Sequence, residues 1–361
     1  MPTLFDPIRL RSLDIRNRVW VPPMCQYSVV AEDGVPTDWH LVHLGSLARG
    51  GAGLVIAEAS AVVPEGRISA RDTGIWNDEQ VPAWRRVTDF IRSQGSASGI
   101  QLAHAGRKAS VFPEWGVEGR GTVPAEQGGW TTVAPSAVAF DGYAAPRALE
   151  LDEIAGVVEA FRAAARRAID AGFDLVEIHA AHGYLVHQFL SPLANLRDDA
   201  YGGSLENRAR LLREIVRAVR AEVGDDLPVL VRFSATDWAE GGWDAQQTVE
   251  VARWLHDDGA DLFDVSSGGL VGGVRIPVGP LYQVGLAEEV AEAGAPTAAV
   301  GLIVTPREAA DVVESGRADA VLLGRATLRD PHWALRAAHE LGAGLAPWPP
   351  QYVRAKTSHA W

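Results

Sequence analysis

The chain has 361 residues, of which 47% are hydrophobic and 22% charged, which is typical of a globular protein with a substantial core. This composition excludes disordered and collagen-like proteins. The formal net charge of −13 disfavours binding to nucleic acid or to anionic membranes, so small molecules are the expected partners.

The amino-terminal residues lack the basic start and unbroken apolar stretch of a signal peptide. No apolar run reaches the roughly 18 residues of a membrane span, and we therefore expect a cytoplasmic protein without membrane contact. A single cysteine, Cys25, excludes an intrachain disulfide and a multi-cysteine metal site.

We expect residues 2–17 to form a hairpin that closes the bottom of the molecule. Beyond it, short apolar or β-branched runs alternate with longer segments of helical period, which is the pattern of β/α units. The predicted strands are Arg18–Pro22, Gly53–Ala57, Gly99–Ala103, Leu175–His179, Val229–Phe233, Leu262–Ser266, Thr297–Val300 and Ala320–Leu323. The predicted helices lie near 39–50, 78–95, 152–171, 206–222, 244–258, 283–293, 306–315 and 332–341.

Two of these helices have recognisable ends. Asp152 precedes one apolar-periodic run and Gly172 closes it, while Thr305 and Pro306 occupy the cap and first-turn positions of another. The pattern thus predicts a helix start at Asp152 and another at Thr305.

The strand runs are apolar on both faces, as in parallel strands covered by helices, and eight of them close most simply into a (β/α)8 barrel of one domain, residues 1–361. A doubly wound sheet is the alternative, but no G-x-G-x-x-G follows a predicted strand. The loop Ala109–Pro135 leaves the carboxyl end of the third strand, where barrel enzymes keep their active sites. We interpret it as a lid.

Polar residues gather where the predicted strands end, and these ends converge in a barrel. In chain order they are Pro23, Met24, Cys25, Gln26 and Tyr27; Glu58 and Ala59; Gln101, His104, Arg107 and Lys108; His179, His182 and Tyr184; Arg232; Ser266, Ser267 and Gly268; Gly301; and Gly324 and Arg325. The last three follow strands seven and eight and suit a phosphate group, since glycines admit a ligand to the backbone and an arginine clamps it. Alternatively, they are turn residues and a surface cation.

Arg232 interrupts the apolar strand VLVRFSATD, where an unpaired guanidinium is costly. Its partner is either a structural carboxylate, for which Asp237 and Glu58 are the candidates, or a cofactor that becomes anionic during turnover. Reduced flavin is such a cofactor.

The segment His179-Ala-Ala-His182-Gly-Tyr184 has two interpretations. The imidazoles bind a divalent metal, completed by His104 and Asp237, or they donate N–H groups to a substrate oxygen while Tyr184 donates a proton. The pair His40 and His43 has the same spacing but lies within an amphipathic helix, where core or surface histidines explain it. His187 is equally ambiguous.

Taken in order, these motifs resemble the Old Yellow Enzyme family of flavin-dependent ene-reductases, in particular its bacterial branch of thermophilic-type and xenobiotic-reductase enzymes. The resemblance runs from about Leu4 to Arg354 through PPMCQYS, DWHLVHLGSLARGGAG, EASAV, GIQLAHAGRKAS, EIHAAHGYLVHQFLSPLANLRDDAYGGSLENRAR, VRFSATDW, DVSSGGL, VGLI and LLGRATLRDP.

The resemblance implies a non-covalent FMN and no metal. Cys25 lies near the flavin N5 and tunes its potential, Arg232 faces N1 and the C2 carbonyl, and the glycines and Arg325 bind the phosphate. The full set of implied flavin contacts is Pro23, Met24, Cys25, Ala59, Gln101, Arg232, Ser266, Gly301, Gly324 and Arg325.

The same resemblance implies that His179 and His182 hold a substrate carbonyl oxygen and that Tyr184 delivers the proton. Tyr27 borders the pocket. Lys108, whose role is as ambiguous in the sequence as that of His187, stands at the mouth of the third strand, and we include it in the substrate site as a residue that orients nearby groups. NADPH or NADH reduces the flavin and departs, and an α,β-unsaturated carbonyl compound then receives hydride and proton by trans addition, with ping-pong kinetics.

The family also implies a homodimer or homotetramer in which Arg354 reaches a neighbouring active site, with residues 345–361 at the subunit interface. The tail AKTSHAW is longer than the pattern, which leaves Trp361 without an assigned role. A metal-dependent hydrolase, a flavin-storage protein and a dihydroorotate-type dehydrogenase are the alternatives.

Overall fold

In the computed structural model, which describes residues 1–344 and 348–355, eight parallel strands close into a barrel. Around the barrel the strands follow the order β10, β11, β12, β3, β4, β5, β8, β9. Their bounds are β3 Val19–Val21, β4 Leu54–Ala61, β5 Ala97–Ala103, β8 Leu175–Ala180, β9 Val229–Ser234, β10 Leu262–Ser266, β11 Thr297–Val300 and β12 Ala320–Leu322. Each corresponds to a predicted strand, so the predicted (β/α)8 architecture is confirmed.

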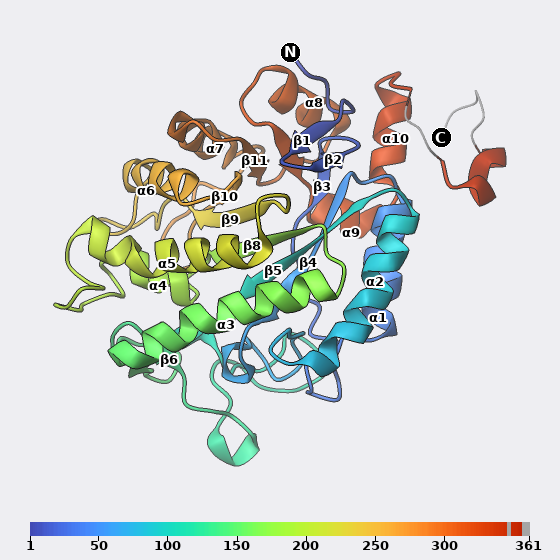
Figure 1. Ribbon diagram of the computed structural model, residues 1–361. Helices are drawn as coiled ribbons and strands as arrows, with labels where there is room; N and C mark the ends of the chain where they lie inside the picture. The colour runs from blue at the N-terminus through green and yellow to red at the C-terminus, as the bar shows by residue number, and fades with distance from the viewer. Residues whose placement is uncertain (345–347, 356–361) are drawn as a thin grey trace.

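Helices form the outer layer of this barrel, with α3 and α5 crossing the front of the view in Figure 1. The long helices are α1 Asp38–Arg49, α2 Val81–Ser93, α3 Leu151–Asp170, α5 Leu205–Val223, α6 Ala245–Asp257, α7 Val284–Val290, α8 Pro306–Glu314 and α10 Trp333–Glu340. Two short helices that the pattern did not predict, α4 Leu185–Leu190 and α9 Arg325–Arg329, directly follow site residues. Within the described residues, no helix is long and apolar enough to cross a membrane.

The predicted helix ends have mixed outcomes. Thr305 caps α8 as expected, since its hydroxyl accepts a hydrogen bond from the amide of Glu308 at 3.2 Å. The prediction for Asp152 was wrong, because α3 begins at Leu151 after the capping residue Glu150. The Glu150 amide donates to the Glu153 carboxylate at 2.8 Å, and this bond fixes the first turn before Asp152 is reached.

The predicted hairpin forms from β1 Ile8–Leu10 and β2 Leu13–Ile15, which pair antiparallel. Its apolar side chains Ile8, Leu10 and Ile15 join the lowest layer of the barrel interior, in one cluster with Trp20 of β3 and Leu54 of β4. The hairpin therefore seals the end of the barrel at which the strands begin.

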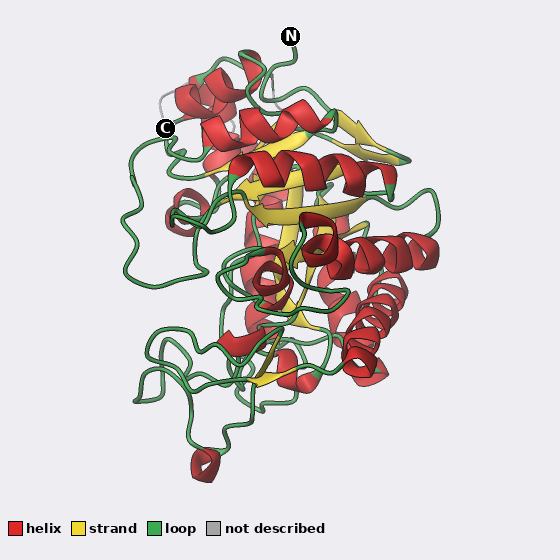
Figure 2. Cartoon of the chain, turned by 90° about the vertical axis from the view of Figure 1, so that its left-hand side faces the viewer, coloured by secondary structure: helices red, strands yellow, loops and turns green. Residues whose placement is uncertain are grey.

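The Ala109–Pro135 loop lies at the opposite end of the molecule from the hairpin, at the bottom of the views in Figures 1 and 2. Its base is anchored, because the Val111 amide donates to Ile68 at 2.9 Å and Val111 forms a β-bridge with Thr122. Near its end β6, Val133–Ala134, pairs with β7, Arg147–Ala148. The loop thus stands at the predicted active-site end.

Candidate active site

An apolar floor at the carboxyl end of the barrel holds three residues predicted to line the site. Cys25, Tyr27 and Tyr184 pack against the buried side chains of Ile68, Ala105, Ala109 and Val111. Burial raises the pKa of the Cys25 thiol well above its usual value, so the protein keeps it protonated. The Trp115 ring of the long loop meets Tyr27 edge to face at 5.1 Å, a contact that sequence reasoning missed.

The turn after β8 brings the two imidazoles and the phenol together. The His179 ring lies 5.3 Å from that of His182 and 5.0 Å from that of Tyr184, measured between centroids. Lys108, which follows β5, contacts this turn. Its ammonium donates a hydrogen bond to the His182 carbonyl at 2.8 Å and lies 5.1 Å from the centre of the Tyr184 ring. Four of the predicted substrate-site residues therefore form one cluster.

Both imidazoles of the pair are held neutral. Burial, reinforced by the nearby Arg232 cation, lowers the pKa of His179 and of His182 well below the usual value. The His179 Nδ1 accepts the Ala181 amide at 3.3 Å, which leaves the proton on Nε2. The Nε2 of His182 lies 2.9 Å from the Ser266 hydroxyl. Neutral rings of this kind donate N–H groups to an oxygen without carrying charge.

Burial also raises the pKa of Tyr184 well above its usual value, which keeps the phenol protonated and able to give up a proton to a stronger base. The pKa of Lys108 falls to about 8, chiefly through burial and then through the neighbouring Arg107.

The prediction that Asp237 or Glu58 is the carboxylate partner of Arg232 was wrong. Its guanidinium Nε pairs with the Asp264 carboxylate at 3.0 Å, because Arg232 of β9 and Asp264 of β10 are register partners on adjacent strands. Asp237 instead contacts His187, and Glu58 contacts His40. The guanidinium stays within the barrel interior, next to His179 of β8 in register.

A buried carboxylate completes this interior layer. The Gln101 amide donates to Glu177 at 2.8 Å, and the second carboxylate oxygen of Glu177 has no hydrogen-bond partner among the described residues. Burial raises the pKa of Glu177 to about 8 and that of Asp264 to about 6. The barrel interior beside His179 therefore combines one guanidinium with two acids whose raised pKa values oppose ionisation.

A buried Glu58 holds the loop after β3 in place. Its carboxylate accepts the Gln26 amide and lies 2.9 Å from His40 Nε2. His40 carries its proton on Nε2, because its Nδ1 accepts the Thr37 amide at 2.8 Å. Pro23 and Met24 are half-buried in this loop, and Cys25 lies beside the Ala59 backbone. His40 is thus a structural histidine, as the sequence interpretation allowed.

A cavity of about 210 Å³ lies where β11 and β12 end. Gly301, with φ of +128°, sits so close to Gln283 that a Cβ atom would lie 2.9 Å from the Gln283 amide nitrogen. Arg325 begins α9, and Arg329 one turn later also lines the cavity. The predicted Gly301, Gly324, Arg325 and Ser266 therefore share one cavity, and Arg329 and Tyr282 are lining residues that the sequence did not single out.

Arg354 takes part in none of these contacts. It is exposed in the segment η6, Pro350–Ala355, whose Tyr352 ring lies under the Arg49 guanidinium at 5.1 Å. Residues 345–347 and 356–361, including Trp361, lie outside the described residues.

The described residues contain no group of three or more His, Cys, Asp or Glu side chains that could hold a metal ion. The predicted flavin residues, in contrast, fit an FMN. The guanidinium of Arg232 and the amide of Gln101 lie in the barrel interior, and a cavity with two arginines stands at strands seven and eight. This combination makes the protein a parallel β/α barrel with a cavity suited to a phosphate-bearing cofactor.

A family model described as the NADH:flavin oxidoreductase / NADH oxidase family matches residues 3–343, so the chain belongs to this family. The resemblance to Old Yellow Enzymes is confirmed, and the protein is an oxidoreductase that uses a flavin and NAD(P)H.

Relatives cover nearly the whole chain. An NADPH dehydrogenase of Listeria innocua is 47% identical over 357 residues, which is 98% of this chain and 99% of that protein. An NADPH dehydrogenase of Bacillus subtilis is 45% identical over 353 residues, 97% of this chain and 98% of that protein.

Two solved structures have the same architecture. The old yellow enzyme homologue from Zymomonas mobilis aligns with a TM-score of 0.78 and 32% identity over 97% of this chain and 96% of that one. Morphinone reductase in complex with tetrahydroNAD aligns with a TM-score of 0.78 and 31% identity over 97% of this chain and 94% of that one.

Proposed function

We propose that this flavin oxidoreductase is an ene-reductase, which reduces the activated carbon–carbon double bond of α,β-unsaturated carbonyl compounds. The observation that carries the proposal is the cluster of neutral His179 and His182 with protonated Tyr184, beside the Arg232 cation. FMN bound by the residues named below would supply hydride transfer between a nicotinamide and the alkene.

The proposed FMN site has one group of residues for the ring and another for the phosphate. Arg232 and Gln101 meet the polar edge of the ring, and Arg232 offsets negative charge there. Arg325 holds the phosphate at the cavity beside Gly301. The remaining proposed contacts are Pro23, Met24, Cys25, Ala59, Ser266 and Gly324.

The proposed substrate site uses neutral hydrogen-bond donors. His179 and His182 donate N–H groups to the carbonyl oxygen and stabilise the negative charge that develops on it. Tyr184 gives its phenolic proton to the α-carbon. Tyr27, with Trp115 against it, and Lys108 border the space and restrict water.

Donor and acceptor share this one space in turn, so the proposal predicts ping-pong kinetics with NADPH or NADH. The NADPH dehydrogenase relatives favour NADPH as the reductant. Morphinone reductase, which aligns over 97% of this chain, was solved in complex with tetrahydroNAD, and this supports a nicotinamide as the reductant.

The test is an absorption spectrum of the purified protein, a titration with 4-hydroxybenzaldehyde, and a turnover assay with NADPH and 2-cyclohexenone. We expect a flavin spectrum, a long-wavelength charge-transfer band on phenol addition, and consumption of both substrates. A yellow protein that oxidises NADPH with oxygen but not with the enone would refute ene-reduction. A colourless protein inhibited by chelators would favour the metal-dependent hydrolase.

A further inference from the structure

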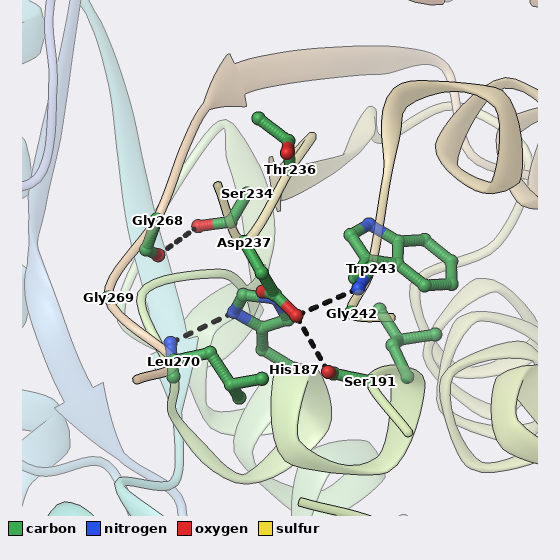
Figure 3. A network of polar contacts seen from close by, with 12 residues as sticks. His187, Ser191, Ser234, Thr236, Asp237, Gly242, Trp243, Gly268, Gly269 and Leu270 are labelled. Atoms are coloured by element: carbon green, nitrogen blue, oxygen red, sulfur yellow. Dashed lines mark hydrogen bonds and ion pairs between the residues drawn. The ribbon is translucent and has the colours of Figure 1, made fainter. Parts of the chain in front are cut away.

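A second pair of buried polar side chains lies behind the imidazole turn, and the proposed chemistry makes no use of it. His187 of α4 and Asp237 after β9 are both fully buried, and His187 Nε2 lies 2.9 Å from Asp237 Oδ1. Asp237 stands at the centre of Figure 3, where Oδ2 accepts the Ser191 hydroxyl at 2.6 Å and the Trp243 amide at 2.8 Å.

The other ring nitrogen of His187, Nδ1, contacts the turn after β8 that carries His182 and Tyr184. This nitrogen accepts the amide of Gly183 at 2.9 Å, and Gly183 is the residue between His182 and Tyr184. An amide nitrogen only donates, so Nδ1 has no proton and Nε2 carries the single proton, facing Asp237. Burial alone would raise the pKa of Asp237, but its partners, His187 first among them, hold the pKa below its usual value.

Gly183 is the point at which this turn is most constrained. Its φ is +74°, and a Cβ atom there would lie 2.1 Å from the Gly269 carbonyl oxygen. The next amide along, that of Tyr184, donates to Ala181 at 3.2 Å, and the preceding amide, that of His182, donates to the Ser234 hydroxyl at 2.9 Å. The His187 ring is thus the acceptor that satisfies the central amide of the turn.

We propose that His187 and Asp237 are positioning residues: Asp237 fixes the Nε2–H tautomer of His187, and that tautomer holds the Gly183 turn so that His182 and Tyr184 face the substrate. The proposal extends the ene-reductase function and rests on it. Both residues are positioning residues and not catalytic ones, because the contacts of the pair are with each other, with the Gly183 amide, and with Ser191 and Trp243.

Replacing Asp237 by Asn tests the tautomer directly. The amide of Asn has one acceptor oxygen, whereas Asp237 accepts from Ser191 and Trp243 at Oδ2 and faces His187 Nε2 with Oδ1. If the Asn nitrogen faces His187, the ring must move its proton to Nδ1, which then opposes the Gly183 amide. If it faces Trp243, two N–H groups oppose each other. Either arrangement loses a hydrogen bond.

Two substitutions of His187 separate its contacts. His187→Asn places an amide oxygen near the position of Nδ1 and preserves the acceptor for Gly183 while giving up Asp237. His187→Gln places its amide near the position of Nε2 and preserves the contact with Asp237 while giving up Gly183. His256→Gln is the matched control, since His256 is exposed and contacts the Ala260 carbonyl just after the end of α6.

Three readouts apply to each holoenzyme variant: the Kd for 4-hydroxybenzaldehyde, the rate of flavin reoxidation by 2-cyclohexenone, and amide hydrogen exchange in residues 180–186. We expect His187→Gln and Asp237→Asn to weaken phenol binding and slow reoxidation about tenfold, the effect of one lost hydrogen bond. Exchange at Gly183 accelerates by a similar factor, whereas His187→Asn stays within about threefold of wild type in all three readouts.

The outcomes distinguish a positioning role from a merely structural one. A structural role predicts that His187→Asn and His187→Gln are equally impaired, and that result, or an Asp237→Asn variant with wild-type exchange at Gly183, would overturn the proposal. If wild-type protein neither binds the phenol nor reduces the enone, the proposed function fails, while the exchange measurement still decides whether the pair holds the turn.

Discussion

Three ionisable side chains lie inside the barrel, where most side chains are apolar. Arg232, Asp264 and Glu177 come from three adjacent strands and are all buried. A guanidinium between two carboxylates is closest to neutral when one acid keeps its proton, and burial favours that state. The buried charges cost stability, and they keep a fixed cation at the position where we propose that a reduced flavin carries negative charge.

This interior predicts a pH-dependent stability of the flavin-free chain. The pKa of Glu177 rises from 4.5 to about 8 through burial first and the Asp264 charge second, so between these values the folded chain holds a proton that the unfolded chain has released. The free energy of unfolding then falls as pH rises through that window. The substitution Glu177→Gln removes this dependence of the free energy of unfolding on pH.

Urea denaturation at pH 5 and pH 8 measures the effect. We expect wild type to lose a few kcal/mol more than Glu177→Gln between the two pH values. Glu250→Gln, on the exposed face of α6, is the control and follows wild type. Parallel profiles for wild type and Glu177→Gln would contradict the assignment.

Tyr184→Phe tests the proton donor at the same scale. The substitution keeps the ring that packs against His179 and removes the phenolic proton. We expect stopped-flow reoxidation by 2-cyclohexenone to slow about 100-fold or more, while reduction by NADPH stays within about twofold. Tyr201→Phe is the control, because that hydroxyl bonds to Glu214 outside the site. Equal rates for wild type and Tyr184→Phe would exclude Tyr184 as the donor.

At the level of elements, periodicity predicted the strands and long helices, because their residues repeat the burial pattern of the barrel. It missed α4 and α9, since helices of six and five residues are too short to show a period. It also missed the Asp264 partner of Arg232. That pair depends on register between neighbouring strands, which is set by barrel closure and not by local sequence.

The candidate site was predictable to a similar extent. The strand ends placed His179, Tyr184 and Lys108 in one cluster because parallel strands bring their carboxyl ends together. Trp115 was not predicted, since a side chain in an irregular loop has no periodic signal for its position. The supporting pair of His187 and Asp237 joins two elements that are distant in sequence, and only the folded chain shows it.

The short helix α9 gives a prediction of its own, because it begins at Arg325 on the rim of the phosphate cavity. Arg325→Ala removes a charge-assisted hydrogen bond to the phosphate, and we expect the Kd for FMN to rise by roughly 10- to 100-fold. Fluorescence titration of the flavin-free protein measures it. Arg317→Ala is the control, since Arg317 pairs with the exposed Glu288. An unchanged Kd would place the phosphate elsewhere.

The barrel has two distinct ends at the scale of the whole molecule. The β1–β2 hairpin fills the end where strands begin, with an apolar layer that excludes water. The other end carries loops, Trp115 over Tyr27, and the polar cluster. The residues that stabilise the barrel and those of the candidate site therefore lie at opposite ends. The loop at 109–135 can vary in sequence without disturbing the apolar layer under the hairpin.

Arg354 is a predicted site residue that lies in neither the imidazole cluster nor the cavity beside Arg325. It is exposed in η6, next to the exposed apolar side chain of Val353 and to Tyr352, which packs on Arg49. We propose that the chain forms a homodimer or homotetramer in which Arg354 completes a neighbouring active site. Sedimentation should then give a mass of two or four chains.

Arg354→Ala tests whether that contact serves the substrate. We expect KM for 2-cyclohexenone to rise about tenfold or more, from the loss of a charge-assisted contact, while the sedimentation coefficient stays the same. Arg329→Ala at the phosphate cavity provides the contrast, because it lowers FMN affinity and leaves KM for the enone unchanged once flavin is saturating. A monomer in solution, or an Arg354→Ala enzyme with wild-type KM, would restrict the active site to the residues of one chain.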